Sequence, residues 1–234
     1  MSAERTREHE RIRAVYSYYE SSDMEQRKRD GANLGNQLNS ATRWSVLQKA
    51  ITRQGLRDGA TILDVGCGSG ADLQRIAQEF GHIRPSLYGV DLISSRIDRA
   101  RSVLPRATLQ VTGGEELKYE DNFFDLVLTS VVFSSVLDAS IARDIAREKI
   151  RVTGKGGAIL CYDMRYPNFR NPNVRPIHRK DLHDLFPRSR ILITPVTLLP
   201  PLARRLGKIT AAAYRPLHGV RLMRSHYLAE IYPN

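Results

Sequence analysis

An acidic residue and three alternating glycines follow a short apolar run, a spacing that suits the binding of a nucleotide-like ligand. Asp64 comes two residues before Gly66, and Gly68 and Gly70 follow at every second position. Glycine permits left-handed backbone angles and lets a ligand approach the main chain closely. The apolar, partly β-branched residues 61–65 predict a buried parallel strand, and residues 72–80 have a helical pattern. Strand, glycine turn and helix in this order form the binding unit of nucleotide-type α/β folds.

A second acidic residue stands where such a fold binds a ribose. Residues 86–91 predict the second strand, which ends at Asp91, 21 positions after Gly70. A carboxylate about 20 residues beyond the glycine turn can accept hydrogen bonds from both hydroxyls of an adenosine ribose. The glycine spacing by itself leaves open a dinucleotide-binding reductase or an α/β domain that binds no ligand.

The string Asp64-x-Gly66-x-Gly68-x-Gly70 resembles motif I of the class I S-adenosylmethionine (SAM) methyltransferases at every acidic and glycine position. The resemblance is close over residues 60–158 and looser elsewhere. It implies SAM as the cofactor and an α/β fold with a Rossmann-like seven-stranded sheet and an N-terminal helical lid. The positions that the resemblance assigns to the cofactor are Asp64, Gly66, Cys67, Gly68, Gly70, Asp91, Leu92, Gly114, Glu115 and Ser130.

The turn after the third predicted strand departs from the pattern of this family. Related sequences commonly read Gly-Asp-Ala-Glu there, with the Asp beside the adenine, and this chain has Gly114 in place of that Asp. One expected side-chain contact is therefore missing. We expect the backbone of Gly114 and Glu115 to line the adenine pocket, or the Glu115 side chain to substitute.

The segment after the fifth predicted strand is the expected acceptor-binding insertion. Residues 163–178 are polar, aromatic and broken by prolines, and they are too long for a simple connection. The string Asn171-Pro172-Asn173-Val174-Arg175 resembles a group of bacterial methyltransferases of glycan and natural-product biosynthesis. The expected substrate-binding residues are Tyr19, Tyr162, Arg165, Asn171, Asn173 and Arg175.

Two residues are candidates for a general base. Histidine has a pKa suited to proton transfer near neutrality, which makes His178 a candidate. His178 also precedes a predicted helix at residues 179–186, so a capping role is the alternative. Asp163, at the end of the fifth strand, is the second candidate.

The predicted elements divide the chain into residues 1–57, with N-terminal helices and a lid, and residues 58–234, the SAM-binding domain. Helices are expected at 5–29 and 40–53, with a loop at 31–39 between them. The later helices are expected at 72–80, 94–104, 141–152, 179–186 and 200–215, and the strands at 61–65, 86–91, 107–111, 122–129, 158–162, 191–199 and 225–232.

Positive charge is concentrated in the last third of the chain. The net charge is +11, and residues 165–234 hold 13 Lys or Arg and 3 Asp or Glu, a net +10. A solvated basic surface is one explanation, and an anionic partner is the other: a phosphate-linked acceptor, a lipid surface or RNA. The basic helix predicted at 200–215 suits peripheral membrane contact, although packing on the domain is favoured.

The remaining composition favours a cytoplasmic protein. The sequence has no run of about 18 apolar residues and no signal-peptide pattern. Its two cysteines suggest neither a disulfide framework nor a metal site, and no metal is expected. The sequence does not determine the oligomeric state.

The expected reaction is methyl transfer from SAM to a small molecule. A hydroxyl of a sugar or of a glycosylated natural-product metabolite is the leading acceptor. The alternatives are N-methylation of a small molecule, RNA methylation through the basic region, and SAM binding without transfer. No appended RNA-binding module is recognisable in the sequence, which argues against nucleic acid.

Overall fold

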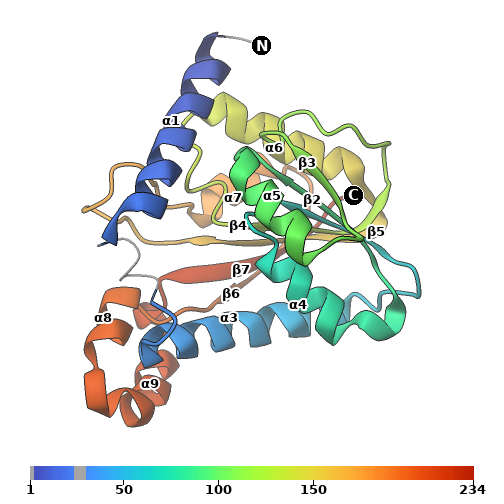
Figure 1. Ribbon diagram of the computed structural model, residues 1–234. Coiled ribbons are helices and arrows are strands. Elements are labelled where there is room, and N and C mark those ends of the chain that lie inside the picture. Colours follow the sequence, from blue (N-terminus) through green and yellow to red (C-terminus); the bar gives the residue numbers. More distant parts are fainter. Residues whose placement is uncertain (1–2, 24–29) are drawn as a thin grey trace.

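A seven-stranded sheet forms the centre of the computed structural model, which describes residues 3–23 and 30–234 (Figure 1). The strand order is β3-β2-β1-β4-β5-β7-β6. The first five of these strands pair in parallel, whereas β7 runs antiparallel to both of its neighbours. The strands are β1 (Thr61–Val65), β2 (Ser86–Asp91), β3 (Thr108–Val111), β4 (Phe124–Ser130), β5 (Thr153–Met164), β6 (Arg190–Pro195) and β7 (His226–Tyr232). The structure thus confirms the predicted Rossmann-like seven-stranded α/β fold.

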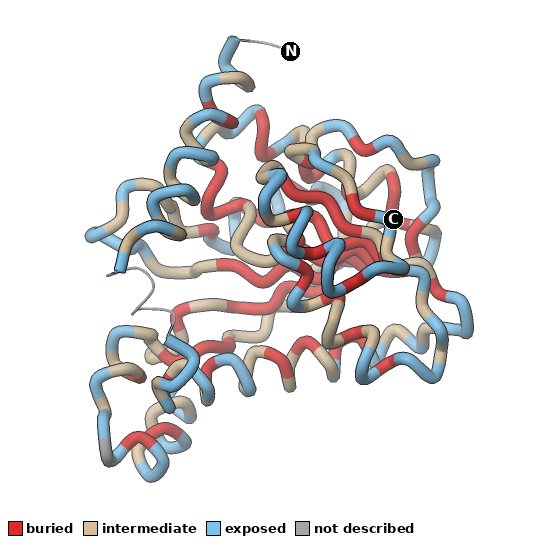
Figure 2. Tube along the Cα trace, in the orientation of Figure 1, coloured by how far each residue is buried: buried red, intermediate tan, exposed pale blue. Residues whose placement is uncertain are grey.

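Helices cover both faces of the sheet, and each face has its own apolar core (Figures 1 and 2). One core includes residues of α6 and α7, and the other includes residues of α3, α4 and α5. The strand interiors are almost continuously buried because both faces are covered. The helices are α1 (Ala3–Ser21), α3 (Leu34–Arg53), α4 (Ala71–Glu79), α5 (Ser94–Val103), α6 (Ala139–Val152), α7 (Arg179–Leu185), α8 (Pro200–Arg205) and α9 (Thr210–Gly219), with short 3₁₀ turns η1 (Gly81–Ile83), η2 (Gly207–Ile209) and η3 (Arg221–Met223).

The glycine turn after β1 lies at the carboxyl edge of the parallel strands. The backbone N–H groups of Gly66 and Cys67 donate to Val90 O of β2, at 2.8 and 3.0 Å. Gly66 and Gly70 have φ angles of +81° and +84°, which a residue with a Cβ rarely adopts. The turn therefore passes from β1 into α4 beside the end of β2, where ligands bind in such folds.

The N-terminal helices differ from their predicted bounds. The loop predicted at 31–39 is wrong, because α3 already begins at Leu34. Asn33 caps that helix by accepting a hydrogen bond from Asn36 N, so a polar stretch starts a helix. Asn39 is buried and donates to Leu198 O at 3.0 Å. The first helix ends at Ser21, and residues 24–29 of its predicted range lie outside the described residues.

The C-terminal third also departs from prediction. The helix predicted at 200–215 is two helices, α8 and α9, separated by η2. Gly207, with φ of +54°, lies at the break, where its missing Cβ allows the left-handed turn. Strand β6 ends at Pro195 rather than at residue 199. Helices α8 and α9 form a small apolar cluster of their own and contact α3.

Candidate functional site

A cavity of about 120 Å³ lies at the carboxyl ends of β1, β2 and β4. Five residues of its wall belong to the positions expected to bind the cofactor. These residues are Gly66, Asp91, Leu92, Glu115 and Ser130. Sequence positions up to 64 residues apart thus meet because parallel strands bring their carboxyl ends to one edge.

Asp91 is almost fully buried in the cavity wall and holds the glycine turn in place. Its Oδ2 accepts from Gly68 N and its Oδ1 from Ile93 N, both at 2.9 Å. Each carboxylate oxygen has a further lone pair, so the group can still accept hydrogen bonds from a vicinal diol. Asp91 therefore combines a structural contact with the chemistry that a ribose requires.

The structure explains the missing acidic residue at position 114. Gly114 has a φ of +88°, and a Cβ at this position would lie 2.9 Å from Val65 Cγ1. A side chain there would need both strained backbone and displacement of a buried valine. The neighbouring Glu115 side chain lies in the cavity wall instead, with its Oε1 2.7 Å from His9 Nε2 of α1.

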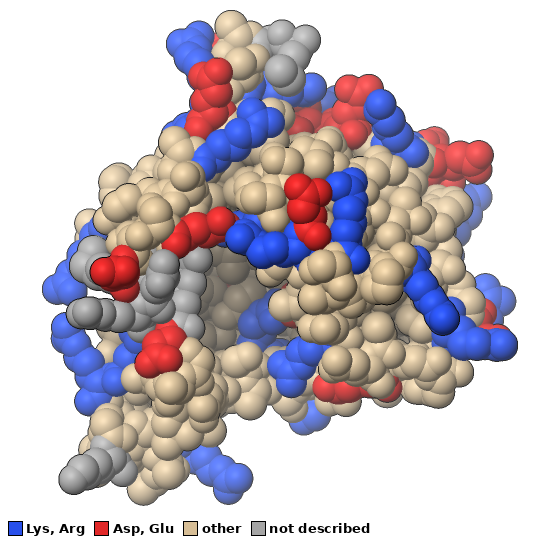
Figure 3. All heavy atoms as spheres, in the orientation of Figure 1, with Lys and Arg blue, Asp and Glu red and all other residues tan. Residues whose placement is uncertain are grey.

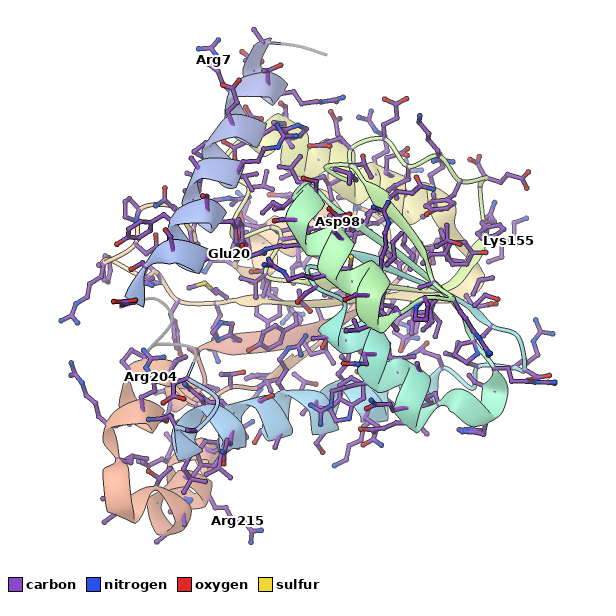
Figure 4. The ribbon with its side chains drawn as sticks, viewed as in Figure 1. Arg7, Glu20, Asp98, Lys155, Arg204 and Arg215 are labelled. Carbon is purple, nitrogen blue, oxygen red and sulfur yellow. The ribbon has the colours of Figure 1, made fainter. Side chains whose placement is uncertain are left out.

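Helix α1 contributes His9, Ile12 and Tyr16 to the wall of this cavity. Tyr16 lies in the wall, and its hydroxyl is 3.1 Å from Ser135 Oγ. The Arg96 guanidinium of α5 lies 4.2 Å from the Tyr16 ring centroid. Arg96 also pairs with Glu20 at 2.8 Å, and Figure 4 shows Glu20 near the end of α1. Burial is the largest influence on the Tyr16 hydroxyl and raises its pKa.

A second, open hollow of about 590 Å³ lies on the outer side of the glycine turn. Tyr19, Cys67, Gly68 and Arg96 are among its lining residues. Figure 3 shows this face of the molecule hollowed below α1. Gly66 lines the cavity and Gly68 lines the hollow, so the two spaces flank the same turn, and Arg96 lines both.

A partly buried charged cluster supports the glycine turn from α3. Arg43 donates to both carboxylate oxygens of Asp72, at 2.8 Å to Oδ1, and to Ser130 Oγ at 2.7 Å. Burial acts to raise the pKa of Asp72, but the hydrogen bonds and charge of Arg43 outweigh it and lower that pKa. Burial, reinforced by the negative charge of Asp72, raises the pKa of Asp64. Asp64 Oδ1 is buried without a hydrogen-bond partner among the described residues.

Backbone strain marks the loop after β4. Val131 has a φ of +57°, which is a rare conformation for a β-branched residue. Its N–H donates to Tyr162 O and its carbonyl accepts from Ser135 Oγ, each at 2.8 Å. Such strain persists only where the surroundings hold it, and it is frequent at functional sites.

Neither of the two predicted bases lines the cavity. Asp163 is fully buried, and its oxygens accept from Ser134 N at 3.2 Å and from Met164 N at 2.8 Å. Burial raises its pKa. His178 is exposed and caps α7. Neither residue belongs to the cavity wall, so a catalytic role for either stays a prediction.

The predicted acceptor residues divide between two places. Asn171 Nδ2 donates to the Tyr19 hydroxyl at 2.6 Å, which joins the insertion to α1. Asn173 lies beside Tyr19 in a small adjoining space, and Arg175 donates to Val136 O at 3.3 Å. The Tyr162 ring stacks on His226, and Arg165 lines a separate basic pocket with His178.

Sequence reasoning missed the contributions of His9, Arg43 and Ser135. His9 and Arg43 lie 55 and 21 residues before Asp64, in helices whose orientation no local motif specifies. Tyr16 belongs to a noticeable tyrosine cluster, which is the one signal in α1 that the sequence offers. Whether His9 and Arg43 reach the site depends on how α1 and α3 pack on the sheet.

The strand order is that of the seven-stranded Rossmann-like fold of class I methyltransferases. A family model described as a methyltransferase domain matches residues 62–157, which contain the glycine turn and Asp91. This match covers less than half of the chain, and it shows that residues 62–157 are similar to methyltransferase domains.

The chain is also similar to named methyltransferases. The chain is 29% identical over 141 residues to the ubiquinone/menaquinone biosynthesis C-methyltransferase UbiE of Vibrio cholerae, covering 58% of this chain and 50% of that protein. It is 28% identical over 111 residues to a 2-methyl-6-phytyl-1,4-hydroquinone methyltransferase of Synechocystis, covering 46% of this chain and 33% of that protein. The chain thus spans half or less of the length of these curated relatives.

Solved structures share the fold at low sequence identity. A putative methyltransferase of Haloferax volcanii, in complex with the Trm112 activator, superposes with a TM-score of 0.61 and 17% identity, covering 82% of this chain and 90% of that chain. Geranyl diphosphate C-methyltransferase of Streptomyces coelicolor superposes with a TM-score of 0.59 and 15% sequence identity. The superposition covers 80% of this chain and 74% of that chain.

No group of three or more His, Cys, Asp and Glu side chains in residues 3–23 and 30–234 is arranged to hold a metal ion. Within the same part of the chain, no helix combines the length and apolar character needed to cross a bilayer.

Proposed function

We propose that this chain binds SAM at the glycine turn and transfers its methyl group to a small molecule. The observation that carries the proposal is the cavity at the carboxyl ends of β1, β2 and β4, where Gly66, Asp91 and Ser130 share one wall. Ligands of open α/β sheets bind at this edge. The family match over residues 62–157 supports the same conclusion.

The residues of the wall suit the separate parts of the cofactor. Asp91 would accept hydrogen bonds from the ribose diol, and the backbone at Gly114 with Glu115 would border the adenine. The Arg43–Asp72–Ser130 cluster offers both signs of charge to the amino-acid end of SAM. Because α1 closes over the cavity, it would act as a lid that keeps water from the sulfonium.

The reaction would be a single displacement at the methyl carbon. The bond from carbon to the positively charged sulfur breaks as the bond to the acceptor atom forms, and neutral S-adenosylhomocysteine leaves. Since SAM is already activated, the chain's main contribution would be to align the acceptor with the methyl group and exclude water. An acceptor that carries a proton must also lose it.

Two kinds of acceptor atom compete. The sequence favours a sugar hydroxyl, and a hydroxyl oxygen and a ring carbon must each lose a proton when they are methylated. The named relatives include a ubiquinone/menaquinone C-methyltransferase and a hydroquinone methyltransferase. We therefore favour a ring carbon of a phenol or quinol over the sugar hydroxyl, and we favour either over RNA.

Calorimetry with SAM tests the cofactor proposal directly. We expect the wild-type chain to bind SAM and Asp91→Ala to bind at least tenfold more weakly, because the variant loses the carboxylate that faces the ribose and holds Gly68. Asp98→Ala, which removes an exposed carboxylate of α5, is the matched control and should bind normally. Undetectable binding by the wild type would refute the proposal.

Product analysis then separates the acceptors. The chain is incubated with SAM and either a hydroquinone or a set of sugars, and each product is examined by mass spectrometry and carbon NMR. A new methyl on a ring carbon supports the quinol assignment, and a new methoxy group on a sugar supports the sequence-based prediction.

A further inference from the structure

A basic pocket lies apart from the methyl-transfer cavity. It has a volume of about 380 Å³ and lies where β5 and β6 end and β7 begins. Three arginines and a histidine line it, namely Arg165, Arg179, Arg221 and His178. Among the described residues, no Asp or Glu forms part of this lining. The pocket shares no lining residue with the cavity at the glycine turn.

The charges of this arginine pocket are not neutralised within the described structure. No ion pair to a carboxylate is found there for Arg165, Arg179 or Arg221. Arg165 instead donates to Arg221 O at 3.3 Å and lies 4.6 Å from the Tyr166 ring centroid. The nearby Asp181 is engaged elsewhere, since it accepts from His178 N at 2.7 Å. Arginines gathered without a counter-charge suit an oxyanion such as a phosphate.

A buried polar group in the same lining also lacks a partner. Tyr227 is 3% exposed, and among the described residues its hydroxyl has no hydrogen-bond partner. A buried hydroxyl without a partner is costly. A phosphate oxygen in the arginine pocket is a chemically suitable acceptor for it.

Two large apolar side chains project from the segments that border this pocket. Phe169 is 93% exposed and Leu222 is 75% exposed. The Tyr166 hydroxyl donates to Leu222 O at 3.2 Å, so the segments that carry Phe169 and Leu222 lie side by side. Exposed apolar residues are common singly, but a pair of this size beside clustered arginines indicates a contact surface.

We propose that this surface docks the protein on a membrane that contains anionic phospholipid. A lipid phosphate enters the arginine pocket, and Phe169 and Leu222 enter the apolar layer beside it. Basic side chains are attracted to an anionic bilayer, and buried apolar side chains add to this attraction. The net +10 of residues 165–234 complements such a surface, and the inference goes beyond the proposed function because docking requires no SAM.

A soluble phosphate compound explains less of the structure. It would account for the arginines and for Tyr227, but it would leave Phe169 and Leu222 exposed to water. A bilayer supplies anionic groups and an adjoining apolar phase, so it accounts for both features. We therefore commit to the lipid surface as the partner.

Co-sedimentation of the full chain with vesicles tests this proposal. One set of vesicles is phosphatidylcholine alone, and the other contains phosphatidylglycerol as well. We expect the wild-type chain to partition at least tenfold more strongly to the anionic vesicles. Phe169→Ser/Leu222→Ser and Arg165→Gln/Arg179→Gln/Arg221→Gln should each weaken that partition about tenfold.

Matched controls exclude a general effect of charge or hydrophobicity. Arg57→Gln/Arg106→Gln/Lys155→Gln removes three exposed positive charges near the opposite, amino-terminal edge of the parallel strands. Figure 4 shows Lys155 well away from Arg204 of α8. Val103→Ser removes an exposed apolar side chain of α5. Both controls should sediment like the wild type, and thermal melting should show that every variant is folded.

Three results would overturn the proposal. The first is a wild-type chain that ignores anionic vesicles. The second is an equal loss of binding in the control that removes Arg57, Arg106 and Lys155, which would indicate non-specific attraction. The third is unchanged binding in Phe169→Ser/Leu222→Ser together with displacement by inorganic pyrophosphate, which would assign the arginine pocket to a soluble phosphate compound.

Discussion

Single residues in this protein both support the site and form part of its wall. Asp91 holds the glycine turn through two backbone amides and also faces the cavity. Ser130 ends β4, contacts Arg43 and belongs to the same wall. Substitutions at such positions change the site and its support together, so their tests need readouts for both binding and stability.

Gly114 tests whether the departure from the family pattern is imposed by structure. We expect Gly114→Asp, which restores the residue common in relatives, to lower the free energy of unfolding by about 1–3 kcal/mol, because of its left-handed backbone and the contact with Val65. Denaturant unfolding measures this loss. Gly156→Asp, at a φ of +82° with open space around it, separates the backbone strain from the clash. Equal losses in both variants would show that the contact with Val65 is unimportant.

Lys149 is a fully buried ammonium group in the described structure, with no hydrogen-bond partner there. Burial lowers the pKa of Lys149 from 10.5 to about 8. Between these pH values the unfolded chain holds the proton that the folded chain has released, so the contribution of Lys149 to stability rises with pH. Below pH 8 both states are protonated, and the cost of burying the charge is constant.

Replacement of Lys149 by methionine should therefore stabilise the protein at pH 7. We expect Lys149→Met to raise the free energy of unfolding by at most about 3 kcal/mol at pH 7, with the advantage shrinking as the pH rises from about 8 to 10. Urea unfolding of both proteins across this pH range measures the difference in the free energy of unfolding. A difference that is independent of pH would contradict the assignment.

At the scale of elements, α1 is the helix of the site that we expect to detach from the sheet at the lowest free-energy cost. Within the described structure, only Glu8 and His9 of this helix are classed as buried, and its contacts with the cavity are largely polar. Its stability thus rests on a few side chains, whereas α3 and α6 each bury several apolar residues. Elements with few buried contacts open at low cost.

Tyr16→Ala should loosen α1 without unfolding the domain. It removes the contacts with Ser135 and Arg96, so we expect faster amide hydrogen exchange across Ala3–Ser21, at least fivefold weaker SAM binding and little change in the global melting temperature. Tyr18→Ala is the matched control, because the Tyr18 side chain is 54% exposed. Should both variants exchange alike, the lid assignment of Tyr16 would fail.

At the scale of the whole molecule, the glycine turn, α1 and the insertion meet near one edge of the sheet. A ligand bound there would contribute to the stability of the folded chain. A ligand that binds only the folded state stabilises it by about 2.7 kcal/mol at a hundred times its Kd. We expect S-adenosylhomocysteine to raise the melting temperature of the wild type by several degrees, and to shift Asp91→Ala much less at the same concentration. An identical shift in both proteins would place the ligand elsewhere.

The sequence by itself determined the sheet core and the cofactor motif. The bounds of β1 and β2 agree with prediction at both ends, because apolar runs and a glycine turn are local signals. The first turn of α3 and the break at Gly207 were predicted wrongly, since one depended on the Asn33 cap and the other on a single left-handed residue.

Only the tertiary structure decided which distant side chains share a space. His9 meets Glu115, and Arg43 meets Asp72 and Ser130, through helices whose packing direction the local sequence does not specify. The structure likewise separated Asp163 and His178 from the cavity and gathered three arginines with Tyr227 in another pocket. Local patterns determine where strands and turns form, whereas burial of apolar faces against the sheet determines which polar groups those elements bring together.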